Sequence, residues 1–168
     1  MAKRNTVLDF VALGMKYGEL SNMHDLNGIR AMLHPDAICY GFKGKDDIIE
    51  GMTNFRIQYD RVRWFFPRGF HEIDSTVDSS VRVEFFLYRE WFQDGKGVTC
   101  NATEYIDFCS YEGLIKYIGY AKEPTGPVDA PHANKSNLAY QKFIEDIRNP
   151  QSAGGGIDDT RNTESTYA

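Results

Sequence analysis

Apolar residues recur at helical spacing in three segments early in the chain. The first helix is predicted over residues 6–20, and the second begins after Asn22, which we expect to cap it. His34-Pro35-Asp36 ends the second helix, because proline cannot continue a helix. A third helix starts near Asp46. The expected core positions are Val7, Phe10, Leu13, Tyr17, Leu20, Leu26, Ile29, Leu33, Ile48, Met52, Phe55 and Tyr59.

The rest of the pattern predicts mainly strands. One short uncharged strand covers residues 37–42, and one or two more cover residues 64–76, interrupted at Pro67 and Gly69. Residues 81–93 and 98–109 form a hairpin around Asp94-Gly95-Lys96-Gly97, and residues 114–122 form the last strand. Helices followed by a meander of strands predict an α+β fold, with the helices on one face of a mostly antiparallel sheet.

The C-terminal part has a different composition. A proline-rich connector over 123–131 is followed by a short predicted helix over 138–147, and the Gly/Ser/Thr/Asp-rich end is expected to be disordered. We therefore divide the chain into a domain over 1–124, a connector and helix over 125–148, and a tail over 149–168.

Composition narrows the function classes. The 168 residues are 42% hydrophobic with a net charge of −5, and no Lys/Arg run exceeds two residues, which argues against nucleic-acid binding. The N-terminal segment is typical of neither a signal peptide nor a membrane span. Three cysteines without CxxC spacing predict buried free thiols and a cytoplasmic protein, and four scattered histidines give no support for a metal site.

Glu104 is the one carboxylate on the apolar face of the strand 98–108. That face carries Val98, Cys100, Ala102, Glu104, Ile106 and Phe108. If the turn centres on Gly95-Lys96, Glu104 lies opposite Leu87 and diagonal to Arg89, within reach of an ion pair. Two interpretations stay open: a structural Glu104–Arg89 ion pair, or an acid inside a ligand cavity.

The segment "YGELSNMHDLNGIRAMLHPDAICYGFKGKDDIIEGM" resembles the opening of the NTF2-like superfamily. That superfamily is the cone-shaped α+β fold of ketosteroid isomerase, SnoaL-type polyketide cyclases and scytalone dehydratase. Asp25-Leu26-Asn27-Gly28-Ile29, Pro35-Asp36-Ala37, Gly44 followed by Ile48, and Asp107-Phe108 with Gly113-Leu114-Ile115 carry the resemblance. It covers roughly residues 6–122 and implies three helices on a strongly curved sheet, with the C-terminal helix as an addition.

The resemblance also implies site residues. Tyr17 falls where ketosteroid isomerase keeps its oxyanion-hole tyrosine, and Glu104 falls near that family's protonated aspartic acid. The family's general base falls at or next to Gly41, which cannot abstract a proton, so steroid isomerase chemistry is not expected. We expect His71 to replace that base, with His34 as second choice, and Arg89 to tune Glu104. The alternative for Tyr17 is an ordinary core tyrosine.

Aromatic residues suggest two surfaces. Tyr40, Trp64, Phe66, Trp91 and Phe108 are expected to line a pocket, although aromatic residues are more often plain core. Phe86, Tyr88, Phe92 and Tyr105 share the opposite sheet face, which in this superfamily commonly forms a homodimer. We expect a homodimer there; the alternative is that the helix 138–147 covers that face. That helix also has a second candidate position, over the mouth of the pocket.

Two functions follow. The first is a cofactor-free isomerase, cyclase or dehydratase that acts on a small hydrophobic, carbonyl-bearing molecule. In it Tyr17 and Glu104 polarise the carbonyl and His71 shuttles the proton. The second is a non-catalytic ligand-binding or dimeric scaffold module, in which Glu104 and Arg89 are structural.

Overall fold

A computed structural model describes residues 3–75 and 77–150. It divides into one unit up to Lys135 and a second from Ser136 onward. Of the predicted tail over 149–168, residues 151–168 lie outside the described residues. The helix predicted near the C-terminus is present in the second unit as α4, Leu138–Arg148, and the Asn137 side chain caps it by accepting from the Tyr140 amide.

The first unit contains the three expected helices with shifted starts. Helix α1 covers Phe10–Met23, α2 covers Leu26–Met32 and α3 covers Lys45–Gln58. Aspartates set the first two starts, because Asp9 accepts from the amide of Ala12 and Asp25 accepts from the amide of Gly28. The prediction that Asn22 caps the second helix was wrong: Asn22 belongs to α1.

The short strand after α2 also differs from its prediction. Strand β1 covers Leu33–Cys39, so it begins before Pro35, and β2 covers only Phe42–Lys43. Between them Tyr40 and Gly41 form a two-residue turn in which both residues have positive φ, 53° and 86°. Two-residue hairpins favour such turns because their twist matches that of the flanking strands. Gly41 is therefore a turn residue and not the centre of a strand.

The remaining strands complete an eight-stranded sheet. They are β3 (Asp60–Phe65), β4 (Phe70–Ile73), β5 (Ser80–Gln93), β6 (Lys96–Cys109), β7 (Ile115–Lys122) and β8 (Val128–Asp129). The main order is β2-β1-β7-β6-β5-β3, while β4 pairs with β5 and β8 pairs with β6. Of the described strand pairs only β1 and β7 run parallel, so the expected mostly antiparallel sheet is confirmed. The prediction missed β8, because it treated the proline-rich segment as a connector.

The register of the long hairpin corrects one expected contact. The turn consists of Asp94 and Gly95, which places Glu104 opposite Phe85 and Arg89 opposite Cys100. Glu104 and Arg89 are thus four residues apart along β6, too far for diagonal neighbours. Among the described residues the structure contains no Glu104–Arg89 ion pair.

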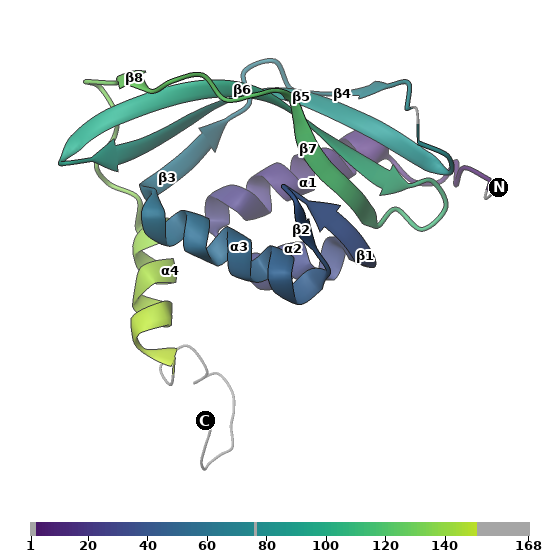
Figure 1. Cartoon of the computed structure of the whole chain (residues 1–168), viewed down its shortest axis with the longest axis horizontal. Coiled ribbons are helices and arrows are strands. Elements are labelled where there is room, and N and C mark those ends of the chain that lie inside the picture. The colour runs from purple at the N-terminus through teal and green to yellow at the C-terminus, as the bar shows by residue number, and fades with distance from the viewer. Residues whose placement is uncertain (1–2, 76, 151–168) are drawn as a thin grey trace, which may run out of the picture. The chain divides into compact units, whose positions relative to one another are not determined.

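Within the first unit the sheet curls over the three helices, as Figure 1 shows. The concave face and the helices share the core, in which Phe10, Ile29, Ile48, Phe85 and Phe108 are all at most 2% exposed. The predicted inward face of β6 is confirmed, since Cys100, Ala102, Glu104, Ile106 and Phe108 are buried. None of the described helices is long and apolar enough to span a bilayer.

Cationic side chains cover part of the outer sheet face. The guanidinium of Arg68 lies over the ring of Phe86, that of Arg82 over Tyr105 and that of Arg61 over Phe92. Tyr88 stays 41% exposed among them. The homodimer through this face stays a prediction.

We predict that Gly41→Ala lowers the free energy of unfolding by about 1 kcal/mol, because an alanine Cβ is disfavoured at φ 86°. Apart from its chain neighbours, no atom of the described residues lies within 4 Å of the added methyl group, so the loss reports backbone strain and not a clash. Urea denaturation measures it. Gly126→Ala is the matched control, because its added methyl group also meets open space and its φ is not in the left-handed region. Equal losses in both variants would contradict the role of the turn.

Candidate functional site

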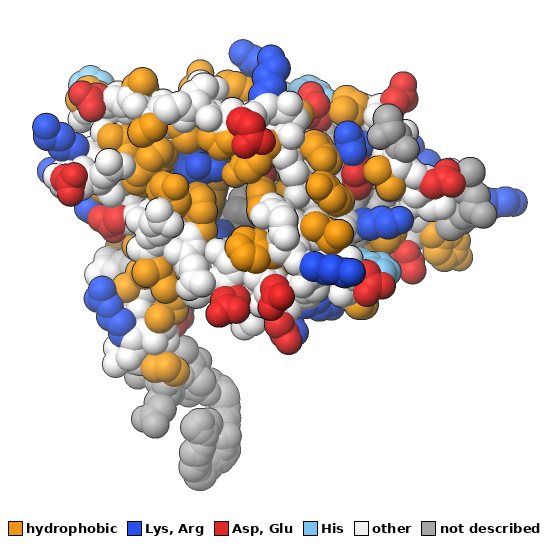
Figure 2. Space-filling model, in the orientation of Figure 1, with side chains coloured by type: hydrophobic (Ala, Val, Ile, Leu, Met, Phe, Trp, Pro, Cys, Tyr) orange, Lys and Arg blue, Asp and Glu red, His pale blue; other side chains and the backbone are white. Residues whose placement is uncertain are grey.

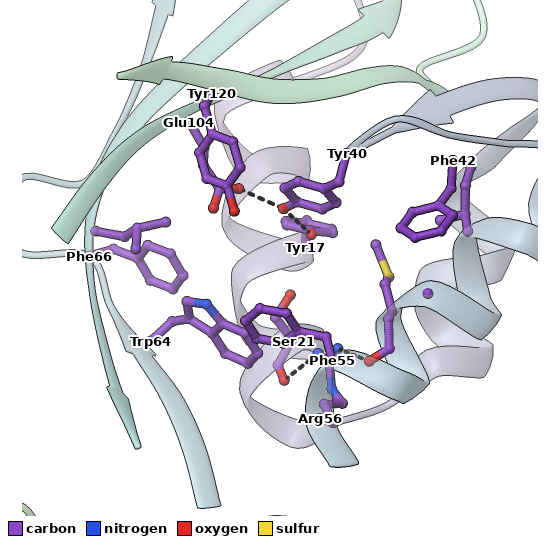
Figure 3. A pocket seen from close by; sticks show the side chains of 14 residues that line it. Tyr17, Ser21, Tyr40, Phe42, Phe55, Arg56, Trp64, Phe66, Glu104 and Tyr120 are labelled. Carbon is purple, nitrogen blue, oxygen red and sulfur yellow. Dashed lines mark hydrogen bonds between the residues drawn. The ribbon is translucent and has the colours of Figure 1, made fainter. Parts of the chain in front are cut away.

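A pocket lies between the concave face of the sheet and helices α1 and α3. Its volume is about 120 Å³. An apolar cavity of about 150 Å³ holds a benzene ring, so this one suits a ring-sized group. Figure 2 shows a hollow bordered by hydrophobic side chains in this face of the molecule. The lining side chains divide into two polar ends joined by aromatic walls, as Figure 3 shows.

Glu104 occupies the first polar end. Its side chain points from the middle of β6 into the pocket, and the residue is 3% exposed. Burial raises the pKa of the Glu104 carboxyl to about 7, although a hydrogen bond from Tyr40 and the charge of Arg89 act in the opposite direction. A carboxyl group with this pKa exchanges protons readily at neutral pH.

Tyr40 and Tyr17 continue from Glu104 as a chain of hydrogen bonds. The Tyr40 hydroxyl donates to Glu104 Oε1 at 2.6 Å, and the hydroxyls of Tyr17 and Tyr40 are 2.9 Å apart. A phenol has one proton, so Tyr17 donates to Tyr40 while Tyr40 donates to Glu104. Burial, followed by the charge of Glu104, raises the pKa of Tyr17 and of Tyr40 well above the ordinary value. Both phenols are therefore protonated donors near neutral pH.

Tyr120 on β7 adds a third phenol to this end. Its ring tilts against that of Tyr40 with centroids 5.7 Å apart, and its oxygen accepts a hydrogen bond of 3.2 Å from Arg89 Nη2. Burial raises the pKa of Tyr120 to about 12, which keeps it protonated. A hydroxyl that accepts from a guanidinium directs its own proton elsewhere, and Tyr120 lines the pocket.

Arg56 and Ser21 form the second polar end. Arg56 lies on α3, is 3% exposed, and donates to His24 Nδ1, the Met52 carbonyl and the Ser21 carbonyl at 2.9–3.2 Å. Burial and then the charge of Arg56 lower the pKa of His24 to about 3, so this imidazole is neutral. These hydrogen bonds hold the guanidinium in one position at the pocket wall.

Aromatic side chains form the walls between the two ends. The side chain of Asn22 holds the Trp64 backbone. Its Oδ1 accepts from the Trp64 N–H and its Nδ2 donates to the Trp64 carbonyl, both at 2.8 Å. The rings of Phe55 and Trp64 stack at 6.2 Å with 22° between their planes. Phe42 lies against Gly51 on α3, where a Cβ would be 2.7 Å from the ring, so glycine permits this contact.

No protein-family model matches the sequence, and the search of curated proteins returned no match. Among solved structures, the chain is similar to Aln2 from a Streptomyces species, with TM-score 0.53 and 12% identity over 66% of this chain and 85% of that one. It is also similar to RV0760c from Mycobacterium tuberculosis, with TM-score 0.53 and 12% identity over 73% of this chain and 95% of that one. The chain has the NTF2-like fold. Likeness at this identity shows the fold, and function has to be argued from the site.

The NTF2-like fold brings most of the expected site residues together. Tyr17, Tyr40, Trp64, Phe66 and Glu104 all line the pocket. Arg89 does not line it and lies one layer behind Tyr120 and Phe55. Tyr17 is both a member of the core and a pocket residue, so the two interpretations of it are compatible.

Three expected site residues are elsewhere. His71 is exposed on β4, because the alternation of that strand turns its side chain outward. Its Nε2 lies 2.6 Å from the Arg68 carbonyl oxygen. Trp91 is buried against the edge of the Tyr59 ring, and Phe108 packs against Phe10 deep in the core. The second choice, His34, accepts from the Asp36 amide beside Pro35, away from this pocket.

Two important residues were missed. Alternation along β7 predicts inward side chains for Ile118 and Tyr120. The inward direction of Tyr120 was therefore predictable once this strand was identified. Arg56 follows the core position Phe55 on α3, and a charged residue there is expected to face solvent. In the described residues, no three His, Cys, Asp or Glu side chains gather as metal ligands do.

We predict that Tyr40→Phe raises the pKa of Glu104 further, by about one unit, because the Tyr40 hydrogen bond favours the charged form. A carbon-detected NMR titration of the glutamate carboxyl groups measures this change. Tyr88→Phe, on the exposed outer face, is the matched control and leaves the titration unaltered. An unchanged Glu104 titration in Tyr40→Phe would contradict the assigned hydrogen bond.

The raised pKa of Glu104 also predicts how stability depends on pH. Between about 4.5 and 7 the unfolded chain releases the Glu104 proton while the folded chain keeps it, so stability falls as pH rises through this range. Glu104→Gln removes this pH dependence. The free energy of unfolding of the variant minus that of wild type should therefore increase by about 2 kcal/mol from pH 4.5 to pH 7. Urea titrations at several pH values measure the difference. A difference between the variant and wild type that stays constant across this pH range would contradict the prediction.

Proposed function

We propose that this chain binds a small, planar, hydrophobic molecule that bears a carbonyl group, and moves a proton on the carbon next to that carbonyl. This is the chemistry shared by cofactor-independent isomerases, cyclases and dehydratases. The observation that carries the proposal is Glu104, a carboxyl group buried in an apolar pocket with a pKa of about 7 and fixed by Tyr40.

Glu104 serves as the proton acceptor. At neutral pH a substantial fraction of this carboxyl is ionised, and the apolar walls leave the carboxylate poorly solvated and reactive toward a C–H proton. The chain from Tyr17 through Tyr40 holds Oε1, so the other carboxylate oxygen is available to the substrate. Glu104 then returns the proton to another carbon for an isomerisation, or to a departing hydroxyl group for a dehydration.

Tyr120 serves as the hydrogen-bond donor to the carbonyl oxygen. Negative charge develops on that oxygen when the neighbouring C–H bond breaks, and a protonated phenol in a dry pocket stabilises it. Arg89 strengthens this donor because its N–H bond to the Tyr120 oxygen withdraws electron density from the hydroxyl. In this scheme Tyr17 is a positioning residue for the acid, and His71 has no part.

The alternative is a ligand-binding protein without catalysis. Glu104 is the one carboxylate among the described residues that line the pocket, and His71 supplies no second titrating group there. A binding protein needs the same apolar walls and polar ends. It differs in that proton exchange on the bound molecule is no faster than in water.

Hydrogen–deuterium exchange separates the two functions. We predict that the protein accelerates deuterium incorporation next to the carbonyl of 2-tetralone in D2O, followed by proton NMR. Glu104→Gln should abolish the acceleration, and Tyr120→Phe should reduce it by about 100-fold, as expected for loss of one oxyanion donor. The rate should increase with pH up to the pKa of Glu104, near 7.

Glu84→Gln and Tyr88→Phe are the matched controls, because both side chains belong to the outer face of β5 and should leave the rate unchanged. Saturable binding of 2-tetralone without faster exchange would support the non-catalytic alternative. If no member of a panel of planar ketones binds, and none exchanges deuterium faster than in water, the proposal is contradicted.

A further inference from the structure

Phe42 covers the pocket on a side that faces solvent. Fourteen described residues line the pocket, and Phe42, at 46% exposed, is the one exposed residue among them; the others are buried or half-buried. In Figure 3 its ring lies across the pocket from Glu104 and Phe66. Phe42 is therefore the wall that separates the end of the pocket remote from the carboxyl group from the surrounding water.

A glycine lies against the Phe42 ring. Gly51 is in the interior of helix α3 and also lines the pocket. A Cβ at this position would be 2.7–2.9 Å from three atoms of the Phe42 ring, closer than Cβ atoms approach other atoms in proteins. Glycine weakens the interior of a helix relative to alanine. Here the missing side chain lets Phe42 lie directly on the helix and close this side of the pocket.

Strand β2 holds Phe42 with few contacts. The strand has two residues, Phe42–Lys43, both exposed, and among the described strands it pairs only with β1 at the edge of the sheet. Gly41 and Gly44, both with φ 86°, stand on either side of it. A segment with so few buried contacts and backbone pairs opens at low cost, so the Phe42 ring is able to leave Gly51.

Tyr40, at the start of the same turn, is held more firmly. Its amide donates to the Ile118 carbonyl at 3.0 Å, and its hydroxyl donates to Glu104 at 2.6 Å. Its ring also packs against that of Tyr120. Movement of Phe42 therefore leaves the carboxyl group and its hydrogen-bond donor in place.

We propose that Phe42 is a gate residue that limits the size of the ligand, and that Gly51 permits this gate to close. The inference rests on the proposed function, which places the carbonyl of the ligand at the Glu104 and Tyr120 end. The far end of the ligand then meets the Phe42 ring. A long substituent at that end is excluded while Phe42 lies on Gly51. The substrate class is thus a compact ketone without a bulky group remote from its carbonyl.

Two ketones that differ at their far end test the inference. 2-Tetralone and 6-benzyloxy-2-tetralone share the carbonyl and the ring system, and the benzyloxy group extends from the ring remote from the carbonyl. Isothermal titration calorimetry compares their dissociation constants. We expect the wild-type protein to bind 2-tetralone about tenfold more tightly, because the longer molecule overfills the closed pocket. General hydrophobicity favours the longer ketone, so it does not produce this preference.

Variants assign the preference to the gate. Phe42→Ala should bind both ketones about equally, because the excluding wall is removed. Gly51→Ala should also reduce the preference, because its methyl group displaces the Phe42 ring. In the Phe42→Ala background, Gly51→Ala should have no further effect, since no ring is left to displace. Phe65→Ala is the matched control, because Phe65 is 45% exposed on β3 and is not among the lining residues.

The outcomes separate this inference from the proposed function. Equal affinities in the wild-type protein, or an unchanged preference in Phe42→Ala, overturn the inference and leave the proposed function standing. An equal change in Phe65→Ala, or an effect of Gly51→Ala that persists in the Phe42→Ala background, also overturns it. If the expected preferences are found but deuterium exchange on 2-tetralone is not accelerated, catalysis fails and the gate stands. If the wild-type protein binds neither ketone, both fail.

A second variant keeps the test decisive if Phe42→Ala does not fold, which circular dichroism and thermal melting establish. Phe42→Leu retains an apolar side chain on β2 and removes the flat ring. It should reduce the preference for 2-tetralone, and an unchanged preference in this variant would overturn the inference.

Discussion

The hydrogen bond of 2.6 Å from Tyr40 to Glu104 is the interaction on which the pocket depends. It joins the tip of the β1–β2 hairpin to the middle of the long strand β6, two segments 64 residues apart in the chain. A carboxyl group on the concave face is costly without a partner, and Tyr40 supplies one from a turn that only positive φ angles can make. Strand β7 lies between β1 and β6, so the curl of three adjacent strands brings donor and acceptor together.

Opposing effects on Glu104 leave its acid–base equilibrium close to neutral pH. Burial disfavours the carboxylate, while Tyr40 and the more distant Arg89 favour it, and burial is the larger effect. A direct ion pair with Arg89 would stabilise the carboxylate and lower the pKa. The register of the β5–β6 hairpin prevents that pair by placing Arg89 opposite Cys100. Arg89 instead donates a hydrogen bond to the Tyr120 hydroxyl, so the register set by one hairpin turn decides the surroundings of both Glu104 and Tyr120.

Some parts of this fold were predictable because they depend on local patterns. The alternation along β6 placed Glu104 on the buried face, and Asp94-Gly95-Lys96-Gly97 marked the hairpin turn, although the turn centres on Asp94-Gly95 and not on Gly95-Lys96. The three helices before the meander were also readable, although the aspartates at positions 9 and 25 moved their starts. Errors occurred where two local signals competed. Pro35 predicted the end of a helix, yet the chain was already extended from Leu33 onward.

The sequence by itself determined which residues face the concave side of each long strand, because side-chain alternation is a property of consecutive residues. It therefore identified Glu104 as the unusual carboxylate, whereas Tyr17 was identified as its candidate companion through the resemblance to ketosteroid isomerase. Only the tertiary structure decided that Tyr40 lies between them, that Tyr120 rather than His71 completes the site, and that Arg56 closes its far end. These side chains come from α1, a turn, α3, β6 and β7. Their meeting depends on the sheet curl and the strand register, which no local pattern encodes.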